Sequence, residues 1–153
     1  MGFDSKFHRA FYKAQLGAGT ELPISGKVFL SIKAEDKGPM LLEAASCLLE
    51  MGFTLIATRG TAAFLADAGI SSSIVNKVYE GRPNIVDQIK DGDIALILNT
   101  TAGAQAVEDS RSMRASALMD GIPYYTTLAA SHAAAFAIKA HAEGDVGVKS
   151  LQE

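Results

Sequence analysis

From residue 27 onward the sequence alternates five times between a short run rich in strand-forming residues and a longer stretch with helical spacing. The expected strands are residues 27–33, 53–57, 74–78, 94–98 and 122–126. The expected helices are residues 36–51, 62–68, 83–90, 104–119 and 129–141. Because parallel strands need long crossover connections, this alternation is typical of a parallel α/β sheet. We predict a three-layer Rossmann-like α/β domain, with a five-stranded, mainly parallel sheet and helices on both faces.

Proline and glycine mark the boundaries of several of these helices. Pro83 suits the first turn of a helix, because its missing N–H would have had no partner there. A glycine just past a helix can adopt the left-handed conformation that ends it. We expect that conformation at Gly52, Gly69, Gly92 and Gly121. The stretch 129–141 is apolar on nearly every side, so it should be mostly buried.

Composition argues against several functional classes. The chain has 153 residues, the length of one domain, and a net charge of −3, so it has no basic footprint for nucleic acid. No apolar run approaches the roughly 20 residues that span a bilayer, and the start lacks the layout of a signal peptide, so we expect a cytoplasmic protein with no membrane partner. Cys47 is the single cysteine, so no internal disulfide can form and a zinc site built on several thiolates is excluded. We expect Cys47 to be an inert core thiol.

Polar residues follow the predicted strands where the carboxyl ends of parallel strands meet. Ligands of open parallel sheets bind at this edge, beside helix N-termini that favour anions. Hydroxyls, lysines and an amide recur there: Lys33 and Lys37, Thr58 and Thr61, Lys77, Asn99 to Thr101, and Thr126 and Thr127. Taken singly, each Thr or Asn is explained as a helix cap or turn former. Taken together, their recurrence at corresponding places favours a phosphate pocket.

Familiar catalytic and nucleotide-binding motifs are missing. The sequence has no G-x-x-x-x-G-K-[ST] and no G-x-G-x-x-G, which argues against a nucleoside triphosphatase or a dinucleotide site. It also lacks G-x-S-x-G and H-E-x-x-H. His8, His132 and His141 are scattered, and carboxylates near the strand ends read as surface or ion-pair residues. We therefore predict an anion-binding pocket with no catalytic residue and no metal site.

The first 22 residues follow a different pattern. Phe3, Phe7 and Phe11 recur every four residues and form an aromatic stripe on one face of a predicted helix. Such a stripe needs a surface to cover. Either it folds back onto this domain or it packs on a neighbouring domain, and the second alternative would make the chain a fragment of a larger protein.

The ordered segments TRGT, VNKVYEGRPNIVDQIKDG, NTTAG, EDSRSMRASAL and YYTTL resemble the C-terminal domain of the large subunit of carbamoyl phosphate synthetase, in the methylglyoxal-synthase-like (MGS-like) superfamily. The resemblance spans residues 1 to about 140. It implies that residues 1–22 are the end of the preceding ATP-grasp half plus a linker. It implies that residues 23–153 are an MGS-like regulatory domain, excised from the synthetase.

This resemblance implies a function for the predicted pocket. The parent enzyme is an ATP-dependent, glutamine-hydrolysing ligase that uses Mg²⁺ or Mn²⁺ and K⁺, works with a glutaminase small subunit, and feeds pyrimidine and arginine synthesis. Its terminal domain has no cofactor of its own and is expected to be non-catalytic. In bacterial members it binds the inhibitor UMP and the activator IMP in one pocket and adjoins the ornithine site. The implied phosphate-binding residues are Ser31, Lys37, Thr58, Thr61, Lys77, Asn99, Thr100 and Thr101, and the ornithine-linked residue is Thr126.

Two features separate this chain from the bacterial pattern, and a rival function stays open. Ala104 and Gln105 stand where basic residues often follow the NTTxG loop, which implies a shifted effector preference. The interval from Lys37 to Thr58 is one residue longer than usual. The rival is a methylglyoxal synthase, which eliminates phosphate from dihydroxyacetone phosphate and needs a carboxylate base. A weaker alternative, suggested by EGRPNIVDQI, is the IMP cyclohydrolase branch, and a homo-oligomer is also open.

Overall fold

The computed structural model describes residues 7–17, 22–77 and 80–143. The strands are β1 (Lys27–Ser31), β2 (Thr54–Ala57), β3 (Ser73–Ile74), β4 (Ile94–Asn99) and β5 (Tyr124–Tyr125). The helices are α1 (Phe7–Gly17), α2 (Pro39–Glu50), α3 (Arg59–Asp67), α4 (Ile85–Lys90), α5 (Ala104–Met119) and α6 (Leu128–Glu143). A short 3₁₀ helix, η1 (Ala34–Asp36), lies between β1 and α2. None of the described helices is both long and apolar enough to cross a membrane.

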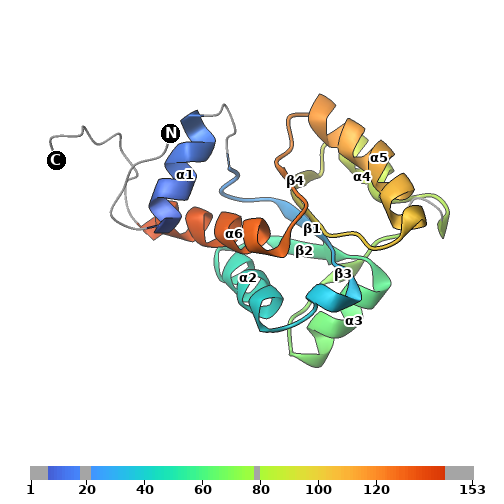
Figure 1. The fold of residues 1–153 in the computed structure, drawn as a ribbon, viewed down its shortest axis with the longest axis horizontal. Helices are drawn as coiled ribbons and strands as arrows, with labels where there is room; N and C mark the ends of the chain where they lie inside the picture. Colours follow the sequence, from blue (N-terminus) through green and yellow to red (C-terminus); the bar gives the residue numbers. More distant parts are fainter. Residues whose placement is uncertain (1–6, 18–21, 78–79, 144–153) are drawn as a thin grey trace, which may run out of the picture.

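The five strands form one sheet in the order β3-β2-β1-β4-β5, and every neighbouring pair is parallel. Helices α2 and α6 cover one side of the sheet, and α4 and α5 cover the other (Figure 1). This arrangement confirms the predicted three-layer α/β fold. The chain builds outward from β1 to β3, then returns to place β4 on the other side of β1. Such a reversal opens a crevice at the carboxyl ends of the two central strands, here β1 and β4.

Two apolar clusters fill the spaces on either side of the sheet. Leu30 and Leu98 point toward α2, α3 and α6, whereas Phe29 and Ile97 point toward α4 and α5. Successive side chains of a strand alternate between faces, so strands that are buried on both sides need continuous apolar runs. Cys47 is buried in the first cluster, as predicted.

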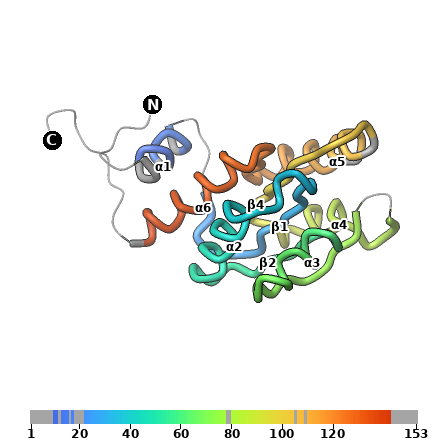
Figure 2. The backbone as a smooth tube through the Cα atoms, turned by 60° about the horizontal axis from the view of Figure 1, so that its bottom comes forward, coloured from blue at the N-terminus to red at the C-terminus, as the bar shows by residue number. Residues whose placement is uncertain are grey.

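Helix α6 is largely buried, which confirms the expectation from its apolar sequence. Helix α1 lies alongside α6 (Figure 2). The ring of Phe11 packs against the core, with its centroid 6.4 Å from that of Tyr125, and the Tyr125 hydroxyl donates to Gln15 Oε1 at 2.9 Å. At Phe11 the aromatic stripe therefore folds back onto this domain. Phe3 and the side chain of Phe7 lie outside the described residues.

Several predicted boundaries need correction. The helix expected from residue 36 begins at Pro39, because residues 34–36 form η1 and Gly38 is the extended N-cap residue. The helix expected from residue 62 begins at Arg59. The strand expected at 74–78 is reduced to Ser73–Ile74, and Val78 lies outside the described residues. The strand predicted at 122–126 pairs only at Tyr124 and Tyr125.

Pro83 does not occupy the first turn of a helix, and that prediction was wrong. Helix α4 begins at Ile85, because Asn84 caps it: the Asn84 side chain accepts from the N–H groups of Val86 and Asp87 at 2.9 and 3.3 Å. The Asp87 carboxylate accepts from the Asn84 N–H at 2.8 Å and completes a capping box. The four predicted C-terminal glycines do have positive φ.

Candidate functional site

A cavity of about 450 Å³ opens at the carboxyl ends of β1, β2 and β4. It lies at the topological reversal between β1 and β4, where open parallel sheets bind their ligands. All of the residues predicted to bind phosphate line it: Ser31, Lys37, Thr58, Thr61, Lys77, Asn99, Thr100 and Thr101. The structure thus brings together residues spread over most of the chain, while their contact with a phosphate stays a prediction.

The threonine hydroxyls of this cavity connect different strand ends. Thr61 Oγ1 accepts from the Ile32 N–H at 3.0 Å and from the Thr58 hydroxyl at 3.3 Å. Thr100 Oγ1 accepts from the Lys33 N–H at 2.9 Å. In the Thr100 bond the oxygen is the acceptor, which leaves the Thr100 hydroxyl able to donate. These bonds hold the segment after β1 against the ends of β2 and β4.

The capping interpretation fails for the threonines that line the cavity. Thr58 is the N-cap residue of α3, yet its side chain makes no capping hydrogen bond. The N-cap residue of α5 is Gly103, so neither Thr100 nor Thr101 caps that helix. Thr127, by contrast, accepts from the Ala130 N–H at 3.1 Å and does cap α6. The cavity threonines therefore differ from the one strand-end threonine that serves as a cap.

Lysines and a close glycine shape the rim of the cavity. A Cβ atom built on Gly60 would lie 3.2 Å from Lys37 Nζ, so the Lys37 ammonium group approaches the first turn of α3 closely. The N-terminus of a helix carries a partial positive charge, and the ammonium group of Lys37 adds a second positive charge beside it. An anion bound between the two would neutralise both. Lys33 pairs with Asp36 at 3.8 Å. Lys37 and the first turn of α3 therefore bring positive charge to the same edge of the cavity.

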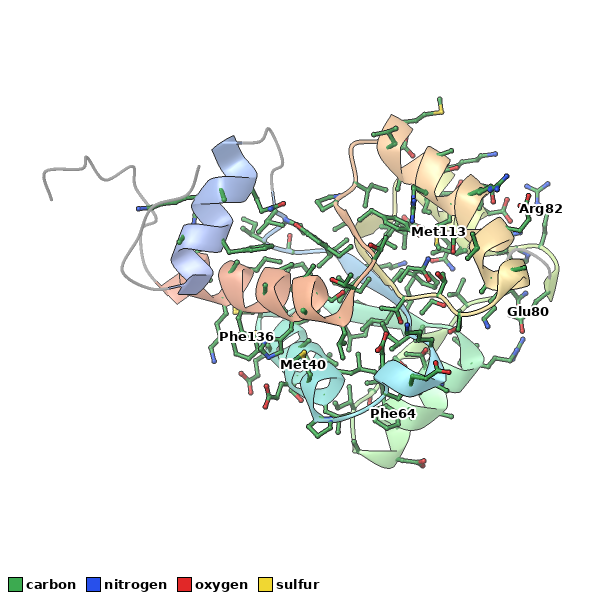
Figure 3. All side chains as sticks on the ribbon, in the orientation of Figure 1. Met40, Phe64, Glu80, Arg82, Met113 and Phe136 are labelled. Carbon is green, nitrogen blue, oxygen red and sulfur yellow. The ribbon has the colours of Figure 1, made fainter. Side chains whose placement is uncertain are left out.

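Lys77 is placed at the rim by a polar network on the β3 side of the cavity. The Asn76 amide accepts from Arg59 Nη2 at 2.9 Å and donates to the Pro83 carbonyl at 3.1 Å. The Lys77 N–H donates to Glu80 Oε1 at 2.7 Å. Glu80 and Arg82 both lie at the outer edge of the domain (Figure 3). This network fixes the backbone from which Lys77 reaches the cavity.

Sequence reasoning missed the apolar wall of the cavity. Phe29 of β1, Ile85 of α4 and Met113 of α5 all line it and are almost completely buried. Figure 3 shows Met113 projecting from α5. These residues read as ordinary core positions in the sequence, and nothing in their spacing marks them as lining residues. Their presence makes the cavity lining partly apolar, beside the hydroxyls and lysines.

Asn99 is one of the buried polar residues that line the cavity. Its Nδ2 donates to Ser110 Oγ at 2.9 Å and to the Tyr124 hydroxyl at 2.6 Å. Ser110 in turn donates to the Ala106 carbonyl at 2.8 Å. The guanidinium of Arg114 lies over the Tyr124 ring, 5.3 Å from its centroid. Ser110 and Tyr124 were also missed, because only the folded chain brings them beside Asn99.

Groups for acid–base or metal chemistry are scarce around the cavity. Among the side chains that the structure describes, Glu35 is the only carboxylate that lines it, and Glu35 is exposed. Over the described part of the chain, no three His, Cys, Asp or Glu side chains gather so as to hold a metal ion. Glu108, in the helix that follows β4, pairs with Arg111 at 3.5 Å, and His132 contacts Glu43 at 2.9 Å.

Thr126 lies apart from this cavity. Its exposed side chain lines a second hollow of about 590 Å³, formed by the end of β5, the last turns of α5 and Gln15 of α1. Tyr124 borders this second hollow and bonds to Asn99 of the first. The structure therefore separates the predicted ornithine-linked residue from the predicted phosphate-binding residues.

Comparisons with known proteins agree with this architecture. Residues 40–126 match the family model of the MGS-like domain. The chain is 48% identical over 153 residues to the carbamoyl phosphate synthase large chain of Myxococcus xanthus and 47% identical over 152 residues to that of Rhizobium meliloti. These matches cover 100% and 99% of this chain. The large chain of Pasteurella multocida is 48% identical over 154 residues.

The chain spans only 13–14% of the length of these relatives, and it matches a C-terminal part of them. The fold, the family model and the matches over the whole length of this chain all indicate the same family. The chain therefore belongs to the MGS-like domain family and is homologous to a C-terminal part of the carbamoyl phosphate synthase large chain.

Proposed function

We propose that this chain is the allosteric regulatory domain of a glutamine-hydrolysing carbamoyl phosphate synthetase, and that it binds a nucleoside monophosphate in the 450 Å³ cavity. UMP as inhibitor and IMP as activator are the proposed effectors. One observation carries the proposal. Buried threonine hydroxyls and the lysines of the cavity rim converge at the carboxyl edge of the sheet, beside an apolar wall. A nucleoside monophosphate has the same division into an anionic and a less polar part.

The chemistry of the polar side suits a phosphate group. Phosphate oxygens accept hydrogen bonds, and the Thr100 hydroxyl can donate one because its oxygen is the acceptor in the bond to Lys33 N–H. The first turn of α3 adds unpaired backbone N–H groups near Lys37. Charged hydrogen bonds of this kind are each worth about 1.5–3 kcal/mol. Micromolar binding corresponds to about 8 kcal/mol, so on this proposal several such bonds act together with burial of the nucleoside against the apolar wall to exceed the cost of association.

Regulation requires the rest of the synthetase. A ligand shifts an equilibrium only if it binds one arrangement of the enzyme more tightly than the other. We propose that Thr126 and the second hollow face the remainder of the large chain, where ornithine binds, and that the glutaminase small subunit completes the assembly in the cytoplasm. On this proposal the 153-residue chain binds its effector but shows no regulation alone.

The test is calorimetric titration of the chain with UMP, IMP, inorganic phosphate and uridine. Either nucleotide should bind, and uridine, which lacks the phosphate, should not. Lys37→Met should weaken nucleotide binding about tenfold, as expected for one lost charged hydrogen bond. Lys90→Met is the matched control, because Lys90 is an exposed lysine of α4 remote from the cavity. A folded chain that binds neither nucleotide would remove the effector assignment.

The rival function, methylglyoxal synthase activity, can be tested through Glu35. It is a carboxylate on the rim of an anion cavity, which is the minimum that a methylglyoxal synthase requires. Incubation with dihydroxyacetone phosphate should give no methylglyoxal above background. Turnover that disappears in Glu35→Gln would establish the phosphate-eliminating lyase instead.

A further inference from the structure

Glu80 and Lys77 are joined by two hydrogen bonds that run in opposite directions. The Lys77 N–H donates to Glu80 Oε1 at 2.7 Å, and the Glu80 N–H donates to the Lys77 carbonyl at 3.0 Å. Lys77 lines the cavity, whereas Glu80 lies outside its lining. Hydrogen bonds to a carboxylate are short and strong because the acceptor is charged. The Glu80 carboxylate therefore holds the backbone of a cavity residue from outside the cavity.

The same carboxylate reaches the first turn of α3. Glu80 Oε2 lies 3.8 Å from Arg59 Nε, and Arg59 Nη2 donates to Asn76 Oδ1 at 2.9 Å. Arg59 is the first residue of α3, and its chain neighbours Thr58 and Gly60 both line the cavity. Through Arg59, Glu80 ties the segment after β3 to the N-terminus of α3. These two segments border the cavity from the same side of the sheet.

The other arginine at this outer edge of the domain has a different partner. Arg82 donates to Asp87 Oδ1 through Nε at 3.1 Å and through Nη2 at 2.6 Å. A guanidinium engaged in this two-point contact is held by that carboxylate. In the part of the chain that the structure describes, Arg59 is thus the cation that pairs with Glu80, which lies at the edge of the domain (Figure 3).

Exposure decides what the pair of Arg59 and Glu80 contributes. The two side chains are 63% and 24% exposed, so solvent screens the pair and its contribution to folding stability is small. Substitutions at either residue should therefore leave the chain folded. Beside the cavity, however, a carboxylate without a counterion would repel an anion. Arg59 offsets that repulsion, while the bond from Glu80 to the Lys77 N–H remains.

Resting on the proposed function, we propose that Glu80 is a positioning residue for anion binding. Its carboxylate fixes the backbone of Lys77, so that the Lys77 side chain is held at the cavity for the phosphate group of the ligand. Arg59 neutralises the negative charge that this arrangement brings near the cavity. Neither Glu80 nor Arg59 contacts the phosphate. This role requires an acceptor atom at position 80, and it does not require a charge there.

Two substitutions of Glu80 separate the acceptor from the charge. Glu80→Ala removes both, whereas Glu80→Gln removes the charge and keeps a side-chain oxygen that can accept the Lys77 N–H. In calorimetric titrations, Glu80→Ala should bind inorganic phosphate and UMP about fivefold more weakly than the unaltered chain. Glu80→Gln should bind both within twofold of the unaltered chain, or more tightly. Equal weakening in the two variants would overturn the positioning role.

A matched control removes a carboxylate from a pair outside the cavity. Glu50 of α2 lies 4.0 Å from Lys139 Nζ of α6, and neither residue lines the cavity. Glu50→Ala should bind phosphate and UMP within twofold of the unaltered chain. A fivefold loss in this control would show that the effect of Glu80→Ala is a general effect of lost surface charge, and it would overturn the inference.

A double-mutant cycle shows whether Glu80 acts through Lys77. Lys77→Met should weaken phosphate binding about tenfold, as expected for one lost charged hydrogen bond. In that background Glu80→Ala should change the affinity by less than twofold, because the side chain that it positions is gone. A full fivefold loss in the Lys77→Met background would overturn the assignment.

The counterion role of Arg59 has its own test. At low ionic strength Arg59→Met should weaken phosphate binding, and Glu80→Gln in the same chain should restore it, since no carboxylate is left to neutralise. Arg82→Met, which removes an arginine from the same edge but leaves Glu80 paired, is the control and should bind within twofold of the unaltered chain. A loss that persists in Arg59→Met with Glu80→Gln would overturn the counterion role.

Hydrogen exchange of the Lys77 N–H reports on the contact without any ligand. Exchange should be slow in the unaltered chain and in Glu80→Gln, and fast in Glu80→Ala. Fast exchange in the unaltered chain would overturn the inference and leave the proposed function in place. A folded, unaltered chain that binds neither phosphate nor UMP would instead remove the proposed function and this inference together.

Discussion

Gly60→Ala separates the stability of the domain from its affinity for anions. Gly60 lies in the first turn of α3 and does not have positive φ, so an alanine fits its backbone. Glycine in a helix is less stable than alanine by roughly 0.5–1 kcal/mol. The substitution should therefore stabilise the free protein by about that amount. For a chain of this length the melting temperature should rise by roughly 1–4 °C.

The same methyl group interferes with Lys37. It would lie 3.2 Å from Lys37 Nζ, and the only atom that it meets within 4 Å belongs to that flexible side chain. The ammonium can retreat by a few tenths of an ångström at little cost to folding. Retreat weakens a charged hydrogen bond to phosphate, and losing about 1 kcal/mol of it lowers affinity about fivefold. Stability should rise while phosphate and UMP affinity fall.

Thermal unfolding followed by circular dichroism, together with calorimetric titration, measures both quantities. Ala66→Gly, on the exposed side of α3, is the matched control and should lower stability by roughly 0.5–1 kcal/mol without changing affinity. In a Lys37→Met background, Gly60→Ala should still stabilise but should weaken binding no further. A Gly60→Ala chain that is stabilised and binds both anions normally would refute the role given to Lys37.

Three further changes test how the fold supports the cavity. Asn84→Ala removes the cap of α4 and should lower the free energy of unfolding by about 0.5–2 kcal/mol in urea titrations. Thr61→Val leaves the buried Ile32 N–H without its acceptor and should cost about 1–3 kcal/mol, with Thr126→Val as an exposed control. Burial raises the pKa of Tyr125 to about 12, so stability should be full below pH 10 and fall as pH rises from 10 to 12. Tyr125→Phe should remove that part of the decline in alkaline urea titrations.

Much of the fold follows from local patterns in the sequence. The alternation of strand and helix signals predicted the parallel sheet, because consecutive parallel strands are usually joined by a crossover helix. The boundaries that failed depended on side-chain contacts. Asn84 and Asp87 form their capping box only once the chain turns at that point, and η1 shortens the segment available to α2. The prediction for Pro83 used only its preference for the first turn of a helix, so it could not take the capping box into account.

The composition of the cavity was predictable only for residues directly after strands. Thr58, Lys77 and Thr100 were recognised because the carboxyl ends of parallel strands always share an edge. Met113 and Ser110 lie within α5. The sequence predicts that these positions are helical, but it does not show that they face the cavity. The hydrogen bond between Asn99 and Ser110, eleven residues further along the chain, could not be predicted either, because only the folded helix α5 brings Ser110 to the end of β4.

The cavity is held open by the same hydrogen bonds that assemble the sheet edge. Thr61 and Thr100 each accept a backbone N–H from the segment that follows β1, and that segment leads into Lys37. Had these threonines been helix caps, their oxygens would have been bound within α3 and α5, and the segment after β1 would have lacked its two anchors. Anchoring by the oxygen leaves the Thr100 hydroxyl able to donate. If the cavity binds an anion as proposed, these residues are already held in place by the fold, so binding should require little ordering of the protein, which favours affinity.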